Sequence, residues 1–536
     1  MPPPTVPTTT PFAFHNDIKC SVLDKESSIT YLDLSFETKL YLPPTECPPG
    51  EASPKVKAPR LDRYVRPSEW SPARKNIMLC IACVATIFAS FAASAYSPGA
   101  EQMAEEFHVS HVAVMVGITS FNMGFALAPM ALAPFSEVRG RKPVFLASGI
   151  VFLVCNICCA VTPTYAGMLI SRFFAGVGSS TFSTMVGGLV ADIYHARDRN
   201  LPMALFSGAA VFGVGLGPLL AGFIAQGTTW RWIFHVQTVV IGVVLAVMAV
   251  CFRESREDVI LRSKARALNH WYESREQVGL FDHYQSPSAT SPQRVRWKTQ
   301  TSAVSAPLRE QVVASLTRPF CLLFTDAVVF FFSLWAAFSW SVLYICLSSI
   351  PLVFEQVHGF SPAQSNAVFA SSCIACLVAT ALGTVQEDLT RKLLILRTTI
   401  KDEPETRLYG SCLQGPLLPI GLLMFGWTSS PSIHWIVPTI AIGVATMGIL
   451  SIYLAVFNYL ADVYGTSASS AIAAQSFCRN ALGGVFPLVT TQMYKAMTTG
   501  GASSFLGGFA ALLSFVPWVL VFYGKRFRER RSVCSK

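Results

Sequence analysis

The sequence predicts an all-α membrane protein whose twelve transmembrane helices form two bundles of six. Three observations lead to this fold class. First, 52% of the 536 residues are hydrophobic and only 13% are charged, whereas soluble domains carry about 25% charged residues. Second, stretches long enough to span a bilayer, which takes about 20 apolar residues, occur six times on each side of a polar gap. Third, short motifs of the first half recur in the second half, which indicates two related halves.

The clearest repeat follows the second span of each half. Residues 133–142 read A-P-F-S-E-V-R-G-R-K, and residues 383–392 read G-T-V-Q-E-D-L-T-R-K. Each copy has an acid at its fifth position and Arg-Lys at its end. L-V-A-D-I-Y at 189–194 and Y-L-A-D-V-Y at 459–464 form a second pair, which supports the same duplication.

The spans divide the chain into five parts. In the first half they are expected at 76–98, 112–133, 144–162, 165–190, 202–226 and 232–251, and in the second half at 320–350, 363–384, 411–428, 434–457, 467–491 and 502–523. The parts are a polar tail (1–75), a first bundle (76–251), a central loop (252–318), a second bundle (319–524) and a basic tail (525–536). In the central loop we expect an amphipathic helix from Glu254 to Gln277 on the membrane surface. For the residues of the loop after this helix, a linker between the bundles and plain disorder are two alternative interpretations.

Basic residues in the short loops predict the orientation, because they collect on the cytoplasmic side. If the N-terminus is cytoplasmic, the outer loops hold only Arg231 and Lys495, while the inner loops hold ten Lys or Arg residues. Both termini and the central loop are therefore expected inside the cell. The net charge of +10 does not by itself indicate a nucleic-acid partner, and none is expected.

The loop after the second span is a candidate gating element. A carboxylate and two cations in one short turn can form a charged latch on the cytoplasmic face. A simple topological anchor is the alternative. The residues concerned are Glu137, Gly140, Arg141 and Lys142, with Glu387 and Arg391 in the second copy.

The fifth span is rich in small residues. Gly213, Gly217 and Gly222 would let another backbone approach closely, and Pro218 would bend the helix. We assign these four residues to conformational change, with generic small-residue packing as the alternative.

Two arginines lie deep inside predicted spans, Arg172 in the fourth and Arg479 in the eleventh. Charges at such depth are expensive and are usually functional or paired. Asp326 is expected to be a boundary residue of the seventh span. A mostly apolar and aromatic site with a few hydrogen-bonding groups is typical of ligand pockets, and the candidates for binding a substrate are Asn122, Arg172, Gln237, Trp340, Tyr344, Gln475 and Arg479.

No catalytic, metal or cofactor site is expected. Cys80 and Cys83 have the spacing of a redox or metal pair, but they lie in an apolar span and are interpreted as small apolar residues. A polytopic membrane enzyme would need clusters of His, Asp or Glu at membrane depth. His235 is the only histidine well within a span and has no acid nearby, so an enzyme is not expected.

These motifs resemble those of the fungal drug:proton antiporters of the major facilitator superfamily, in the twelve-span branch, over roughly residues 68–528. Residues 134–143 resemble the loop motif P-L-S-E-x-x-G-R-R/K-P, and residues 172–176 match R-F-F-x-G. Residues 213–222 resemble the antiporter motif G-x-x-x-G-P-x-x-G-G, with Ala221 in place of one glycine. Asn122 departs from the family, in which an apolar residue is usual.

The resemblance implies proton-driven export of a small organic compound, such as a secondary metabolite, a toxin or a drug. The partners of the protein would then be this solute, protons and the lipid bilayer. The protein would act as a monomer in the plasma membrane, and the vacuolar membrane is an alternative location. Few carboxylates occur in the spans, which favours neutral, amphipathic or anionic solutes over polyamines. An uptake carrier or facilitator of the same fold is the alternative.

Overall fold

The structure is a computed structural model that describes residues 18–21, 29–38, 59–195, 198–277, 281–284, 293–299, 308–396, 408–464 and 468–524. The chain forms two compact units. One combines Met1–Trp70 with Glu254–Pro307, and the other combines Ser71–Arg253 with Leu308–Lys536. The second unit holds the membrane-spanning helices. The basic tail 525–536 lies outside the described residues.

The first half of the membrane unit is helical throughout its spans. Its helices are α1 (Pro72–Ser94), α2 (Ala100–Phe107), α3 (His111–Arg139), α4 (Arg141–Val161), α5 (Tyr165–Thr184), α6 (Val186–Ile193), α7 (Asn200–Gly227) and α8 (Arg231–Cys251), with a short 3-10 turn, η3 (Ser97–Gly99), between α1 and α2. Two of these helices begin at side-chain caps, because the hydroxyls of Ser110 and Thr164 accept hydrogen bonds from the first turns of α3 and α5. Within this half, α1 packs on α7, and α5 packs on α3 and α4.

The second half repeats this pattern with more interruptions. Its helices are α11 (Leu308–Thr325), α12 (Ala327–His358), α13 (Pro362–Ala367), α14 (Ala370–Leu396), α15 (Tyr409–Gln414), α16 (Leu417–Thr428), α17 (Ile436–Tyr464) and α18 (Ala468–Leu513), followed by a helical stretch at 516–524. Asp326 caps α12, because its carboxylate accepts hydrogen bonds from the backbone of Val328 and Val329. The boundary role of Asp326 is thus confirmed. The seventh span begins at Ala327 rather than near residue 320, because this cap separates it from α11.

Twelve crossings fit the described helices. Ten helical segments in the described part of the chain are long and apolar enough to cross a membrane. One of them, Ser470–Gly524, has 55 residues, which is enough for two crossings at 1.5 Å per residue. It is broken at Thr498, where φ is 60° and ψ is 166°. The short pair α15 and α16 supplies the remaining crossing.

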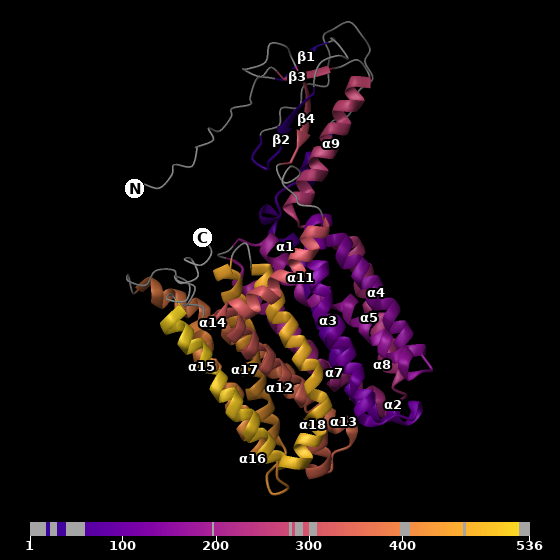
Figure 1. Cartoon of the computed structure of the whole chain (residues 1–536), viewed down its shortest axis with the longest axis vertical. Helices are drawn as coiled ribbons and strands as arrows, with labels where there is room; N and C mark the ends of the chain where they lie inside the picture. Colours follow the sequence, from indigo (N-terminus) through magenta and orange to yellow (C-terminus); the bar gives the residue numbers. More distant parts are fainter. Residues whose placement is uncertain are drawn as a thin grey trace. The chain divides into compact units, whose positions relative to one another are not determined.

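The two halves meet along a few helix pairs. In Figure 1 the purple helices α3, α4, α5 and α8 lie together, and the orange and yellow helices α14 to α18 lie together. Between the halves, α3 packs on α18, and α7 packs on α13 and α14. Hydrogen bonds join the halves as well, from the Ser97 hydroxyl to the Leu347 carbonyl and from the Ala363 amide to the Gln226 side chain.

The other unit is a small α/β fold that the sequence analysis does not anticipate. Strands β1 (Ile18–Ser21) and β2 (Ile29–Asp33) come from the N-terminal tail, and β3 (Phe281–Tyr284) and β4 (Gln293–Lys298) come from the central loop. They form one sheet in the order β1-β3-β4-β2, in which β2 runs parallel to β4 and the other pairs are antiparallel. Tail and loop therefore fold together.

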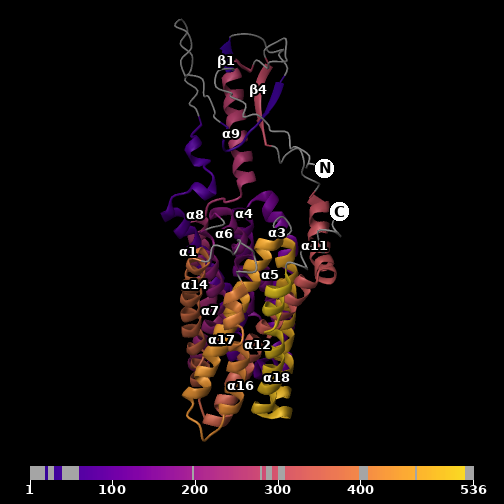
Figure 2. The same ribbon diagram turned by 90° about the vertical axis from the view of Figure 1, so that its left-hand side faces the viewer.

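The predicted loop helix exists as α9 (Glu257–Gln277), and it packs on β3 and β4 (Figures 1 and 2). Its apolar residues Leu268, Trp271 and Tyr272 are buried in a core that also contains Val295 and Trp297. The prediction that this helix lies on the membrane surface is wrong, because the sheet already covers its apolar face.

Polar contacts also tie α9 to the sheet. The Arg296 guanidinium donates to both carboxylate oxygens of Glu276 at 2.8 Å, which raises the pKa of Arg296. The Asn269 amide bonds to both the backbone N–H and the carbonyl of Trp297, at 2.7 and 2.9 Å. Helix and strand are thus held in one register.

Candidate functional site

A buried arginine stands at the centre of the candidate site. Arg479 on α18 is 1% exposed. Its guanidinium carbon lies 4.4 Å from the centroid of the Trp340 ring and 4.8 Å from that of the Tyr453 ring. Among the described residues, none of its three nitrogens has a hydrogen-bond partner. The rings stabilise the cation through their faces, but its N–H groups remain available.

Gln475 adds a second set of free polar atoms. It precedes Arg479 by four residues on α18, so both side chains project from one face of the helix. Gln475 is fully buried, and neither its amide oxygen nor its amide nitrogen has a partner in the described part of the chain. Buried polar groups are normally hydrogen-bonded, so this pair indicates a place for a polar ligand group.

The aromatic side of the site joins the two halves of the protein. The Trp340 and Tyr453 rings pack at 5.3 Å, and Tyr344 lies one turn after Trp340 on α12. The Tyr344 hydroxyl lies beside the Asn122 amide and the Trp340 indole, within the electrostatic reach of both Arg479 and Arg172. Asn122 comes from α3, so the first half contributes directly to the site.

A glycine allows this approach. A Cβ atom at Gly484 of α18 would lie 2.8 Å from the Asn122 Cβ, which is too close for any larger residue. Beside it, the Thr119 hydroxyl donates to the Gly484 carbonyl at 2.7 Å. The contact between α3 and α18 therefore fixes Asn122 against the second half.

Arg172 has a different environment. It is also 1% exposed, but it donates to the Ala92 carbonyl at 2.9 Å and to the Gly117 carbonyl at 3.4 Å. Its guanidinium lies over the rings of Tyr96 and Phe121. It therefore ties α5 to α1 and α3, and only its Nη2 lacks a partner among the described residues.

Gln237 on α8 is buried, and its amide has no described partner. Its helix packs mainly on α4 and α1, and no described contact joins it to Arg479. The structure thus brings together Asn122, Trp340, Tyr344, Gln475 and Arg479, with Arg172 nearby, and leaves Gln237 apart. Sequence reasoning missed Tyr453, because an aromatic residue in an apolar span normally indicates packing alone.

An ion pair at the junction of α3 and α4 joins the first repeated motif (133–142) to the second (189–194). Arg141 is 5% exposed and donates from Nε to the Asp192 carboxylate at 3.0 Å and from Nη1 to the Ser136 hydroxyl at 3.3 Å. The sequence predicts Glu137 as the acid of this latch, whereas the acid that binds Arg141 is Asp192. Gly140 has φ 104° and ψ 158°, a conformation that essentially only glycine adopts.

The remaining candidate gating residues of the two motif copies are Lys142, Glu387 and Arg391. Lys142 donates to the Ala249 carbonyl at 3.2 Å and so links the start of α4 to the end of α8. In the second copy of the motif, the backbone of Glu387 and Arg391 lies within α14. Their side chains lie outside the described residues, so a role for them stays a prediction.

The glycines of α7 lie at close helix contacts. A Cβ atom at Gly213 would clash with the Ile87 carbonyl, and one at Gly217 would clash with the Ser94 side chain, both on α1. At Gly222 it would lie 2.5 Å from the Asn366 Cβ on α13 in the other half. Pro218 is buried within α7. The close backbone approach that the sequence predicts is confirmed, while its use in gating stays a prediction.

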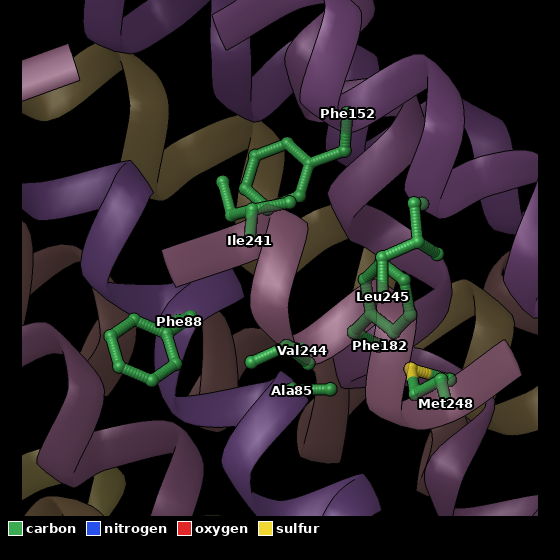
Figure 3. Close-up of a pocket in the computed structure, with 9 residues that line it drawn as sticks. Ala85, Phe88, Phe152, Phe182, Ile241, Val244, Leu245 and Met248 are labelled. Atoms are coloured by element: carbon green, nitrogen blue, oxygen red, sulfur yellow. The ribbon is translucent and has the colours of Figure 1, made fainter. Parts of the chain in front are cut away.

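A separate pocket lies within the first half (Figure 3). It is lined by apolar residues of α1, α4, α5 and α8, including Phe88, Phe152, Phe182, Leu245 and Met248. This lining offers no polar side chain that could orient a ligand. The Arg479 region is therefore the stronger candidate for a substrate site.

The sequence profile described as Major Facilitator Superfamily matches residues 82–487. The chain belongs to this superfamily. Its relatives include the "Multidrug transporter TPO1_1" of Candida glabrata, which is 32% identical over 87% of this chain and 78% of that protein. The "Efflux pump FUBT" of Fusarium oxysporum is 32% identical, and the match covers 87% of this chain and 74% of that protein. The "MFS transporter cpaT" of Aspergillus oryzae is 30% identical, and the match covers 86% of this chain and 89% of that protein. All three relatives are fungal and are named as transporters or pumps.

Solved structures of the Major Facilitator Superfamily have the same fold. The proton:xylose symporter XylE superposes with a TM-score of 0.57 at 16% identity, covering 84% of this chain and 97% of its own. The human organic anion transporter MFSD10 superposes with a TM-score of 0.52 at 14% identity, and the match covers 83% of this chain and 100% of that chain. The predicted membrane architecture is thereby confirmed: two six-helix bundles, as in these transporters.

Proposed function

We propose that this chain is a proton-coupled secondary transporter that exports a small organic compound by alternating access. The observation that carries the proposal is the buried polar site between the halves, to which α3 contributes Asn122 and α18 contributes Arg479. A site at the boundary of two bundles can open to either side when one bundle rocks against the other. The fungal relatives named as multidrug transporters and efflux pumps support export as the direction.

Proton coupling, location and state of assembly belong to the same proposal. The antiporter-like glycines of α7 lie against α1 and α13, where a change of packing would alter the gates. The distribution of Lys and Arg supports cytoplasmic termini, and the export role supports the plasma membrane. The substrate site is built within one chain, so a monomer suffices for function.

Inside-out vesicles containing the full chain test this function. Their lumen corresponds to the outside of the cell, so export appears as accumulation of the solute in the lumen. With a panel of neutral, anionic and cationic aromatic compounds, an acidic lumen should drive accumulation of at least one member, and a protonophore should abolish it. Accumulation only under the reversed pH gradient would indicate an uptake carrier and overturn the proposed direction.

A further inference from the structure

The central site carries a positive charge without a counter-ion in the described part of the chain. Every acidic side chain described in the membrane unit lies near a helix end, in α2 or in a loop. Asp192 pairs with Arg141 and Glu106 pairs with Arg231, and no described acid forms an ion pair with Arg479. A guanidinium that is 1% exposed needs compensation, because an isolated buried charge is very costly.

The free donors of this site have a defined chemistry. The three nitrogens of Arg479 carry N–H groups in one plane, in a fork that fits a carboxylate through two parallel hydrogen bonds. The guanidinium carbon lies over the rings of Trp340 and Tyr453, and none of the three nitrogens has a hydrogen-bond acceptor among the described residues. The Gln475 amide, also without a described partner, can donate to the same anion.

The contrast with Arg172 makes this assignment specific. Both arginines are 1% exposed and both lie over two aromatic rings. Arg172 donates to two backbone carbonyls, whereas Arg479 has no such bond among the described residues. Burial and ring stacking alone therefore do not explain Arg479.

The surroundings favour a ligand with an apolar body. Trp340, Tyr453 and Tyr344 supply aromatic surface next to the guanidinium. Asn122 and the Tyr344 hydroxyl can form one or two further hydrogen bonds. Arg479 is the arginine of this site that has no acceptor for any of its nitrogens among the described residues, so one anionic group would match it, and a cationic ligand would be repelled by it.

We infer that the Arg479 site binds an aromatic or amphipathic organic monoanion, with its carboxylate on Arg479 and Gln475 and its apolar body on Trp340, Tyr453 and Tyr344. This inference rests on the proposed transport function, since it names the class of solute that the site accepts. The anion supplies the counter-charge that the protein itself does not place beside Arg479.

Three probes with one ring system test the class of ligand. The full chain in lipid nanodiscs is titrated calorimetrically with 1-naphthoate, 1-naphthamide and 1-naphthylmethylammonium. A charge-assisted hydrogen bond contributes about 1.5–3 kcal/mol, so naphthoate should bind at least about tenfold more tightly than the neutral amide. The ammonium compound should bind more weakly than both. Equal binding of the acid and the amide, or a preference for the ammonium compound, overturns the inference.

Two variants locate the preference at Arg479. Arg479→Gln should reduce the ratio of naphthoate to naphthamide affinity to near one, with little change for the amide. Gln475→Glu places a carboxylate four residues before Arg479, where an ion pair within the helix can form. It should also abolish the preference for the acid while it keeps the arginine and the helix. Arg266→Gln, which removes an exposed positive charge on α9, is the control and should keep the wild-type ratio.

The outcomes separate this inference from the proposed function. If both site variants keep the preference for naphthoate, the anion does not bind at Arg479 and the inference fails. If Arg479→Gln does not fold, Gln475→Glu still decides the question. Vesicle export of a neutral or cationic compound without any preference for the acid overturns the inference alone. Preference for the acid that depends on Arg479, without transport in either direction, overturns only the proposed function.

Discussion

The ion pair between Arg141 and Asp192 gives the sharpest quantitative prediction. Their N···O distance is 3.0 Å, and the two side chains are only 6% and 12% exposed. Removing one partner of a buried pair costs about 3–5 kcal/mol, and the slight exposure here favours the lower end of that range. Asp192→Asn should therefore lower the free energy of unfolding by about 3 kcal/mol, because the Arg141 charge stays buried without its carboxylate.

A double-mutant cycle measures the pair itself. Arg141→Gln alone should cost a similar amount, and Arg141→Gln with Asp192→Asn should cost clearly less than the sum of the two single changes. Unfolding by SDS in mixed micelles gives the three values, and transport in vesicles is measured in parallel. Additivity within about 0.5 kcal/mol would refute the reasoning, because the two residues would then act independently.

Glu137 provides the control for this cycle and a test of the gate. The residue is half-buried in the last turn of α3, so Glu137→Gln should change the free energy of unfolding by less than about 0.5 kcal/mol. If the motif 133–142 acts in gating, the same variant should still slow transport several-fold, because the charge balance at the gate changes. Transport at the wild-type rate would leave the loop as a topological anchor.

Three further predictions concern other parts of the molecule. Gly217→Leu should abolish transport, because its side chain would meet the α1 backbone. Gly227→Leu should not abolish it, because nothing lies within 4 Å of a Cβ atom at that position. Vesicle assays of both variants at matched expression test this difference. Arg296→Gln should destabilise the α/β unit by about 1–3 kcal/mol, because a bidentate ion pair is lost. Limited proteolysis of the central loop in the full chain should therefore become faster. Arg266→Gln, at an exposed position, should leave the cleavage rate unchanged. In a cysteine-free background, Lys495→Cys should react with an impermeant maleimide on intact cells and Arg266→Cys only after permeabilisation; the reverse pattern would contradict the orientation.

Much of the membrane fold is predictable because its signals are local. An apolar run of about 20 residues predicts a span, and a capping residue such as Asp326 predicts where it begins. The sheet of the α/β unit depends instead on distant pairing, since Ile29 lies opposite Arg294. The alternation in Ile29–Asp33 and Gln293–Lys298 is a strand signal, but neither short segment indicates its partner. An amphipathic helix such as α9 therefore predicts a membrane-surface position when the sheet that covers its apolar face cannot be recognised from the sequence.

The candidate site was predictable in its residue types and less so in its contacts. Arg479 and Asn122 are both buried, and their role in binding stays a prediction. Sequence patterns do not reveal that Arg172 donates to backbone carbonyls, because carbonyls are present at every position. The partner of Arg141 was likewise hidden, since Glu137 is closer in sequence than Asp192.

The two buried arginines show how one residue type can have two roles in one membrane protein. Arg172 donates hydrogen bonds to backbone carbonyls of α1 and α3, which solvate its guanidinium within the first half. The Arg479 cation lies over the ring faces of Trp340 and Tyr453, which stabilise it, while its N–H groups have no described acceptor. A cation held in this way keeps its position without a ligand and still gains energy from an anion. This arrangement favours binding of an anionic solute at the boundary between the halves, where rocking of the bundles can expose it to either side.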